Sequence, residues 1–390
     1  MRMAVLILGV LAGLQSGAAV SDPVAQLQGR IKNGAATLDF DQRRGYLDSL
    51  LRNLKVPISS QTLVFSKTSL QTDRISPATP RAIYFNDDVY VAWAPGASLI
   101  EIMAVHPQRG SIFYMLEQRQ EQRPGFVVST GHECSVCHFA RESPSKFVPK
   151  LLFDSVIPDA AGNVEGTFPV PVTDQSPFEE RWGGWYVTGT HGKQRHLGNV
   201  VLKRPASVMG GVAGVDFTRS TNVTDLKSRF DASRYLSPHS DIVALMVLAH
   251  QIEVHNLIAL AGGKPAARPE EAGEPLVRAM LFSGAAPLTD SVRGTSNFAV
   301  DFAGLGPRDS RGRSLRDFDL KTRLFRYPMS YLIYSRAFDG LPGAVKTYVY
   351  RRFREILNGA DKSGKFTHLS PADRSAISEI LRETKRDLKL

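Results

Sequence analysis

Two cysteines and the histidine that follows them are the residues of this chain best suited to chemistry. Cys134 and Cys137 are the only cysteines, and His138 comes directly after the second. A Cys-x-x-Cys pair can form a redox disulfide, supply half of a zinc site or, when histidine follows, attach haem covalently. In haem attachment each thiol bonds one vinyl group of the porphyrin, and the histidine coordinates the iron.

The spacing of these residues favours haem attachment. A zinc site needs two more ligands, usually from a second pair that this chain lacks, and a thioredoxin-like disulfide does not require the histidine. Random placement of the cysteines and histidines would give this pentapeptide with a probability on the order of one in ten thousand. The sequence therefore predicts one covalent haem c on Cys134 and Cys137, with His138 as the proximal iron ligand. A simple disulfide with an incidental histidine is the alternative.

The N-terminal residues predict export, and c-type haem is attached outside the cytoplasm. Arg2 precedes an apolar run from Ala4 to Leu14, and small residues follow up to Ala19. This layout is typical of a secretory signal, and the run is short for a membrane span. We expect residues 1–19 to be a signal peptide and the mature protein to be periplasmic or otherwise exported. We expect no transmembrane segment after cleavage.

The charge of the chain bears on its partners. The formal net charge is +10 at pH 7, and a basic surface attracts anionic partners. In an exported protein such partners are acidic proteins or the membrane surface, and not nucleic acid. The positive charges are scattered, without an arginine-rich arm or zinc-finger spacing, which favours an ordinary solvated basic surface. We expect an acidic redox protein as the partner.

The elements around the motif predict an α+β protein. We expect a β-rich N-terminal half that carries the haem attachment motif and a mainly helical C-terminal half, because more than a hundred residues before the motif exclude a small class I cytochrome c alone. The regions 20–205 and 206–390 form two domains or one continuous domain. Hairpins are expected within 81–96 and 98–118, a strand at 125–130, a strand–turn–strand unit at 151–170, and helices at 38–55, 240–263, 323–338, 344–359 and 369–388.

The sequence offers several candidates for the iron ligand opposite His138. A methionine or a histidine can occupy that position, or it can stay open. His250 follows an apolar run in the predicted helix 240–263, and Met246 lies one turn earlier on the same face. We predict His250 as the distal ligand or a distal-pocket residue, with Met246, His196 and an open site as alternatives. A hydrogen-bonded core histidine is the structural alternative.

A glycine-rich segment offers a further part of the cofactor pocket. Arg195 and His196 follow Trp182 and Trp185 in the run RWGGWYVTGTHGKQRHLGN. Cations could bind the haem propionates and tryptophan could cover the ring face. An ordinary glycine-rich surface loop over a contact between the two tryptophans is the alternative.

Several blocks of the sequence, taken together, resemble a known family. They are PRAIYFNDDVYVAW, the Cys-x-x-Cys-His segment, RWGGWYVTGTHGKQRHLGN, SDIVALMVLAHQIEVHNLI and RLFRYPMSYLIYSRAF. They resemble an uncharacterised family of exported, cytochrome-c-like proteins with a single haem motif, over most of Ala82 to Leu388. The resemblance implies one haem on Cys134, Cys137 and His138 and electron transfer, with no assigned reaction.

Single-electron transfer is the function that these features predict. The protein would set the haem potential through the axial ligand and burial. The rival prediction is a haem enzyme, or a protein that binds oxygen, carbon monoxide or peroxide at an open distal site.

Overall fold

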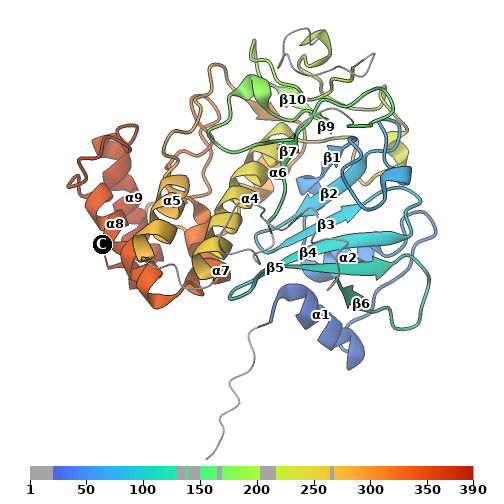
Figure 1. Cartoon of the computed structure of the whole chain (residues 1–390), viewed down its shortest axis with the longest axis horizontal. Coiled ribbons are helices and arrows are strands. Elements are labelled where there is room, and N and C mark those ends of the chain that lie inside the picture. Colours follow the sequence, from blue (N-terminus) through green and yellow to red (C-terminus); the bar gives the residue numbers. More distant parts are fainter. Residues whose placement is uncertain are drawn as a thin grey trace, which may run out of the picture.

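A seven-stranded antiparallel sheet and a group of helices make up the described part of the chain (Figure 1). The computed structural model describes residues 21–129, 138, 150–164, 169–202, 217–263 and 268–389. The sheet belongs to the N-terminal half and most helices to the C-terminal half, so the predicted α+β class is correct. The predicted signal peptide, Cys134 and Cys137 lie outside the described residues.

The strands follow one another in the sheet nearly as they do in the chain. Their order is β6-β5-β4-β3-β2-β1-β9. The two predicted hairpins are confirmed as β2–β3 and β4–β5, and the Asn86 side chain closes the first by accepting from the amides of Asp88 and Val89. The bounds are β1 (Thr62–Val64), β2 (Arg81–Phe85), β3 (Val89–Trp93), β4 (Leu99–His106), β5 (Gly110–Glu117), β6 (Phe126–Val128) and β9 (Trp185–Tyr186).

Two small ribbons accompany the main sheet. One ribbon confirms the strand–turn–strand unit expected at 151–170. The other pairs a strand of the glycine-rich segment with a strand of the C-terminal half. They pair β7 (Asp154–Ser155) with β8 (Val170–Pro171), and β10 (Gly189–Thr190) with β11 (Arg293–Gly294).

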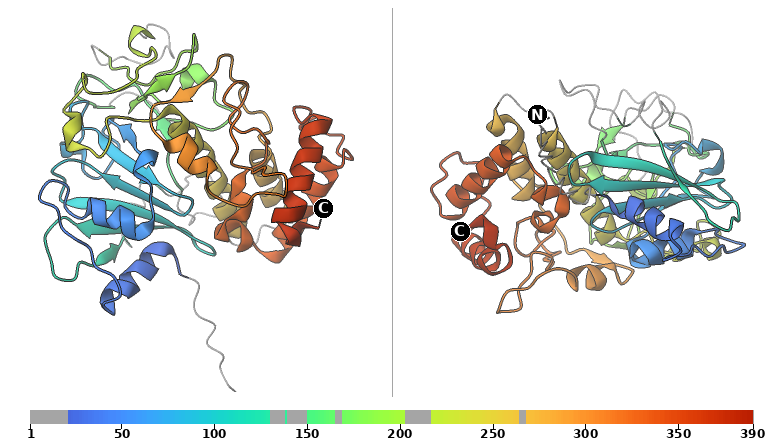
Figure 2. Two further views of the ribbon diagram at one scale, coloured as in Figure 1. Left: turned by 180° about the vertical axis from the view of Figure 1, so that it is seen from behind. Right: turned by 90° about the horizontal axis from the view of Figure 1, so that it is seen from below.

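Two N-terminal helices cover one face of the main sheet. α1 (Pro23–Lys32) and α2 (Leu47–Leu54) lie against it, as Figure 2 shows. Because side chains alternate between the faces of a strand, one row of buried residues meets these helices. That row crosses four strands and consists of Tyr84, Val91, Ile102 and Tyr114.

The C-terminal half is built from α-helices joined by irregular segments. The helices expected at 240–263, 344–359 and 369–388 are confirmed as α4, α8 and α9. The bounds are α4 (Ile242–Gly262), α5 (Pro269–Met280), α6 (Phe298–Ala303), α7 (Arg336–Asp339), α8 (Gly343–Leu357) and α9 (Pro371–Thr384). Short 3-10 helices are η1 (Ile58–Ser60), η2 (Thr72–Arg74), η3 (Phe178–Glu180), η4 (Phe217–Arg219), η5 (Ala232–Arg234), η6 (Tyr331–Tyr334) and η7 (Arg386–Leu388).

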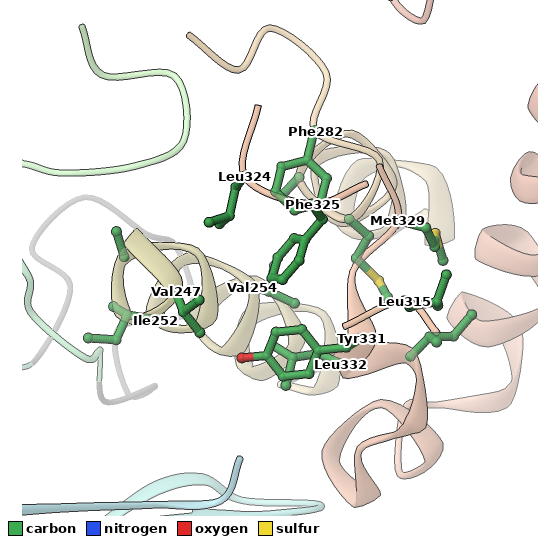
Figure 3. Packing of buried hydrophobic residues seen from close by; sticks show 14 of the residues in the cluster. Val247, Ile252, Val254, Phe282, Leu315, Leu324, Phe325, Met329, Tyr331 and Leu332 are labelled. Atoms are coloured by element: carbon green, nitrogen blue, oxygen red, sulfur yellow. The ribbon is translucent and has the colours of Figure 1, made fainter. Parts of the chain in front are cut away.

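α4 lies between the sheet and the other helices (Figure 1). Buried apolar side chains surround it, including those drawn in Figure 3. Among the described helices it alone is long and apolar enough to cross a membrane, and 83% of its most apolar window is buried inside the protein. A helix that is apolar on all sides is commonly a buried core helix.

Two predicted helices are shorter in the structure. In the segment 38–55, the side chain of Asp41 accepts from the amides of Arg43 and Arg44. The resulting turn ends at Gly45, whose φ of +62° suits glycine, so the helix begins only at Leu47. The segment 323–338 contains Pro328, which disfavours a continuous helix, and it forms η6 and α7 instead. Sequence analysis missed α1, α5 and α6.

One hydrophobic cluster crosses the predicted boundary at residues 205 and 206. It joins Val64, Phe85 and Tyr90 of the sheet to the buried side chains of α4, α5 and α8. The other cluster contains α1, α2 and the opposite face of the sheet. The sheet therefore lies between two cores, and α4 belongs to the one on the C-terminal side.

Asp241 anchors the start of α4. Its Oδ1 accepts from the amides of Val243 and Ala244, which caps the helix, at 2.8 and 3.3 Å. Its Oδ2 accepts from the amides of Thr295 and Ser296 at 2.9 and 2.8 Å. The residue is 1% exposed, so this one carboxylate connects two segments inside the core.

We expect Asp241→Ala to lower the free energy of unfolding by about 3 kcal/mol, because it leaves several buried amides without an acceptor. Urea unfolding followed by circular dichroism measures this loss. Ser370→Ala, at the exposed N-cap of α9, is the matched control and should cost about 1 kcal/mol. Equal losses in the two variants would contradict the role given to Asp241.

Candidate functional site

The face of the sheet opposite α1 and α2 carries a second cross-strand row. Its members are paired in register from β2 to β5, and α4 approaches the same face. His255 of α4 meets the row at Tyr90, whose hydroxyl lies 2.8 Å from the histidine Nδ1. The row consists of Phe85, Tyr90, Met103 and Phe113.

His138 lies half-buried at the end of this row. Its ring is tilted against that of Phe113, with 4.6 Å between the centroids. Its Nδ1 is 2.7 Å from the backbone oxygen of Lys150. The amide of Lys150 donates in turn to the carbonyl of His138 at 2.6 Å. The two residues therefore hold each other through a reciprocal pair of hydrogen bonds.

The bond to Lys150 decides which ring nitrogen of His138 carries the proton. A carbonyl oxygen only accepts, so Nδ1 is the donor and Nε2 keeps its lone pair. Burial lowers the pKa of His138, although the hydrogen bond to Lys150 opposes this, and the ring is neutral at pH 7. A neutral imidazole whose Nδ1–H is bonded to a backbone carbonyl is a common form of histidine as a metal ligand.

α4 holds the segment that supplies this carbonyl. The side chain of Asn256 bonds both backbone groups of Leu151: Oδ1 accepts from the amide at 2.7 Å and Nδ2 donates to the carbonyl at 2.9 Å. Leu151 follows Lys150 directly. The position of the carbonyl that orients His138 is therefore tied to a buried helix.

The two cysteines of the motif, Cys134 and Cys137, lie outside the described residues, so the geometry above does not include them. Within the described ranges, no group of three or more histidine, cysteine, aspartate or glutamate side chains is arranged to hold a metal ion. His138 is thus the one member of the motif that the structure describes, and on the sheet its ring contacts Phe113, which is paired with Met103.

His250 is buried and both of its ring nitrogens have partners. Nδ1 lies 2.6 Å from Oδ2 of Asp174, and Nε2 lies 2.8 Å from Oγ of Ser330. The carboxylate of Asp174 accepts from Nδ1–H, and the hydroxyl of Ser330 engages Nε2. Coordination of iron by His250 would require one of these bonds to break. Its role as a distal residue stays a prediction, and the geometry is that of a hydrogen-bonded core histidine.

Asp174, His250 and Ser330 have the residue types of a hydrolytic triad. Ser330 is fully buried, and its Oγ also caps η6 by accepting from the amide of Leu332. The ring of Phe282 covers His250, with 4.4 Å between the centroids. A nucleophile must reach its substrate, and this serine is enclosed, so the arrangement is structural.

Met246 lies one turn before His250, as the sequence predicts, and is 3% exposed. It packs in the core cluster and contributes to the wall of a cavity between α4, α5 and the segment 322–328. Met103 differs because it lies on the sheet, half-buried and directly across from Phe113, the residue that His138 contacts.

The structure brings Trp182 and His196 together inside the protein. Their ring centroids are 5.4 Å apart, and His191 lies 4.7 Å from His196. Burial lowers the pKa of His196 to about 3, so its ring is neutral. Among the described residues, neither ring nitrogen of His196 has a hydrogen-bond partner, nor does Nε2 of His191. The pair is a buried aromatic cluster, and its contact with a cofactor stays a prediction.

The side chains of Trp185 and Arg195 have other contacts, although the Trp185 amide donates to the Trp182 carbonyl at 3.0 Å. Trp185 donates from Nε1 to the carbonyl of Asp154 at 3.0 Å and packs on Phe153. Arg195 is exposed, with its guanidinium 5.8 Å from the ring centroid of Phe217. A propionate could reach Arg195 only at the surface, and this role too stays a prediction.

Sequence analysis missed the residues that orient His138. Lys150 acts through its backbone, so its side-chain type carries no signal. Asn256 had one available signal, because it is a polar residue in a helix that begins with a long apolar run, and a polar residue of a buried helix needs an internal partner. Phe113 was placed in a strand, but its contact with His138 depends on tertiary structure.

Comparison with known proteins identifies no relative. No family model, no curated protein and no solved structure matches the chain. The resemblance to cytochrome-c-like proteins therefore stays an expectation from the sequence.

Glu253 of α4 is a partly buried acid with a raised pKa. Burial raises its pKa to about 7, and the nearby charge of Asp174 adds to the effect. Its Oε2 accepts from the Asp174 amide at 3.3 Å. Between its usual pKa of 4.5 and about 7, the folded state binds the proton more tightly than the unfolded chain. The free energy of unfolding therefore falls as the pH rises through that window.

We expect Glu253→Gln, which keeps the acceptor and removes the charge, to be more stable than the wild type at pH 8 by more than about 1 kcal/mol. The difference should shrink towards pH 4.5 and is measured by urea unfolding across this range. Glu180→Gln, at an exposed position of η3, should show no such pH dependence. A constant difference at all pH values would contradict the pKa assignment.

Proposed function

We propose that this chain is an exported c-type cytochrome-like protein that carries one covalent haem and passes single electrons. The proposal begins with the motif of Cys134, Cys137 and His138. The observation that supports it best is the hydrogen bond from Nδ1 of His138 to the Lys150 carbonyl. This bond leaves Nε2 as the ring atom suited to iron, as haem attachment would need.

The described residues fit a haem on this face of the sheet. Phe113 and Met103 offer apolar contact. Arg81 lies on the same face and is close enough to His138 to oppose protonation of the ring. Arg81 is paired with Glu101 at 2.8 Å, and its Nε is buried without a partner. An arginine of this kind is suited to a propionate.

The haem would supply a reversible one-electron couple, and the chain would control its environment. The two thiols would attach it, and His138 would present Nε2. The Lys150 carbonyl would keep the proton on Nδ1 and increase the basicity of the ring. Because Asn256 holds the neighbouring residue, this orientation would not change with the oxidation state.

Met103 is the candidate for the second axial ligand that we favour. It is half-buried, it lies on the same face as Phe113, and its thioether is a known haem ligand in cytochromes. His255 also reaches this row, but its Nδ1 is engaged by the Tyr90 hydroxyl. That hydroxyl also accepts from the side-chain amide of Gln251 at 2.8 Å.

An open distal site would favour the alternative function, a haem enzyme or a protein that binds small ligands such as carbon monoxide. The coordination of the iron distinguishes these two functions. A six-coordinate, low-spin iron that does not bind carbon monoxide supports electron transfer, whereas a high-spin iron that binds it supports the alternative.

Export and an acidic partner complete the proposal. The signal-like N-terminus supports an extracytoplasmic location. The net charge of +10 supports a partner of opposite charge, because such a surface speeds encounter with an acidic protein.

We expect Cys134→Ser combined with Cys137→Ser to give a colourless protein that accumulates poorly, since both thioether bonds are lost. Mass spectrometry of the mature protein measures this directly, because the wild type should carry an increment of ~616 Da that the variant lacks. A wild type of bare polypeptide mass would refute the haem. A variant with normal yield and fold would show instead that the fold does not need it.

We expect Met103→Leu to convert low-spin iron to a high-spin form that binds carbon monoxide, because leucine keeps the volume and removes the sulfur ligand. Visible absorption spectra of both oxidation states test this. Met246→Leu is the matched control and should leave the spectrum unchanged, since Met246 lies in the core. If Met246→Leu changed the spectrum and Met103→Leu did not, the distal ligand would be Met246 of α4.

A further inference from the structure

A cavity of about 510 Å³ lies between α4, the end of α5 and the segments 282–288, 322–328 and 364–368. Its apolar part includes Met246, Phe282, Leu324 and Phe325. Figure 3 shows Phe282, Leu324 and Phe325 close together beside α4. The ring centroids of the two phenylalanines are 5.7 Å apart. A volume of this size with an aromatic wall is typical of a small-molecule site.

The charged residues of this cavity are almost all basic. Asp174 is its single acidic residue, and Oδ2 of that carboxylate already accepts from His250. A wall with this imbalance attracts anions, and partial enclosure strengthens the attraction because solvent screens it less. The basic residues of the wall are Arg181, Arg278, Arg323, Lys365 and His368.

Arg278 is the unusual member of this set. It lies half-buried near the end of α5, and its Nε is buried without a hydrogen-bond partner. Its guanidinium makes no hydrogen bond or ion pair with any residue of the described ranges. A partly buried cation without a counter-charge is costly, so a partner is expected.

Arg181 adds a second cation that no carboxylate binds directly. It is 5% exposed, and its guanidinium donates to the backbone oxygens of Ser176 and Asp174, both at 2.9 Å. Burial lowers the pKa of Arg181, which shows that its surroundings disfavour the charge. Arg323 differs, because its guanidinium is paired with Asp373 at 2.6 Å.

We propose that this cavity binds a small organic carboxylate with an apolar body, whose carboxylate pairs with Arg278 and whose body lies against Phe282 and Leu324. A guanidinium matches a carboxylate with two parallel hydrogen bonds. The aromatic wall favours an apolar body over a free inorganic anion. Asp174 repels a second negative charge, which disfavours a dianionic phosphate.

This site is separate from the proposed haem function. None of its lining residues is a member of the haem motif or of the cross-strand row, and binding can be measured without reference to the iron. Failure of the carboxylate proposal therefore leaves the haem proposal untouched, and the reverse also holds.

Isothermal titration calorimetry of the full mature protein tests the proposal with four probes. They are 4-phenylbutyrate, octanoate, the uncharged 4-phenylbutanol and inorganic phosphate. We expect at least one of the carboxylates to bind. Phenylbutanol lacks the carboxylate and phosphate lacks the apolar body, so each should bind at least about tenfold more weakly. Failure of both carboxylates to bind at millimolar concentration would overturn the proposal, as would phosphate binding of equal affinity.

Variants locate the binding in this cavity. Arg278→Gln should weaken carboxylate binding by about tenfold or more, since one charge-assisted pair is lost. Arg326→Gln is the matched control, because Arg326 is exposed beside the cavity and does not line it. Lys365→Gln, at an exposed position on the wall, should weaken binding less and serves if Arg278→Gln fails to fold. Unchanged affinity in both wall variants would overturn the assignment.

Discussion

The burial of α4 is the constraint on which the rest of the structure depends. The helix lies between the sheet and the other helices, with apolar side chains on all sides, yet its second half is rich in polar residues. A buried polar group without a partner costs about 1–3 kcal/mol, so neighbouring segments must supply partners. The polar residues are His250, Gln251, Glu253, His255 and Asn256. Their partners come from Asp174, Ser330, Asn86, Tyr90, Tyr331 and Leu151.

This requirement links the core to the motif. Asn256 satisfies its amide with both backbone groups of Leu151, and Lys150, the preceding residue, orients His138. If the orientation of the histidine ring is already fixed, a change in the oxidation state of the iron needs little rearrangement of the protein. This suits electron transfer. The same core helix thus serves stability and positions the proposed iron ligand.

Partners also decide the chemistry of each histidine. His138 and His191 donate from Nδ1 to backbone carbonyls and keep a lone pair on Nε2. His250 has the same donor, but a serine hydroxyl occupies its Nε2. Three residues of one type therefore differ in whether they can bind a metal, and no property of the residue itself reveals the difference.

Local patterns predicted much of the fold. The hairpins of β2–β3 and β4–β5 follow from alternating residues around clear turns, and α4, α8 and α9 follow from periodicity and caps. The predictions for 38–55 and 323–338 were too long because Gly45 and Pro328 interrupt a pattern that otherwise looks helical. α5 was missed because Pro275 lies within it.

The sequence by itself determined the two hairpins and the positions of α4, α8 and α9. It also singled out Cys134, Cys137 and His138 as the candidate chemistry, because these signals lie within a few residues of one another. The tertiary structure alone decided which nitrogen of His138 is available, why His250 is engaged and which basic residues line one cavity. The physical reason is distance along the chain. The partners of His250 and Asn256 lie 76 and 105 residues away, and only the fold brings such groups within hydrogen-bonding reach.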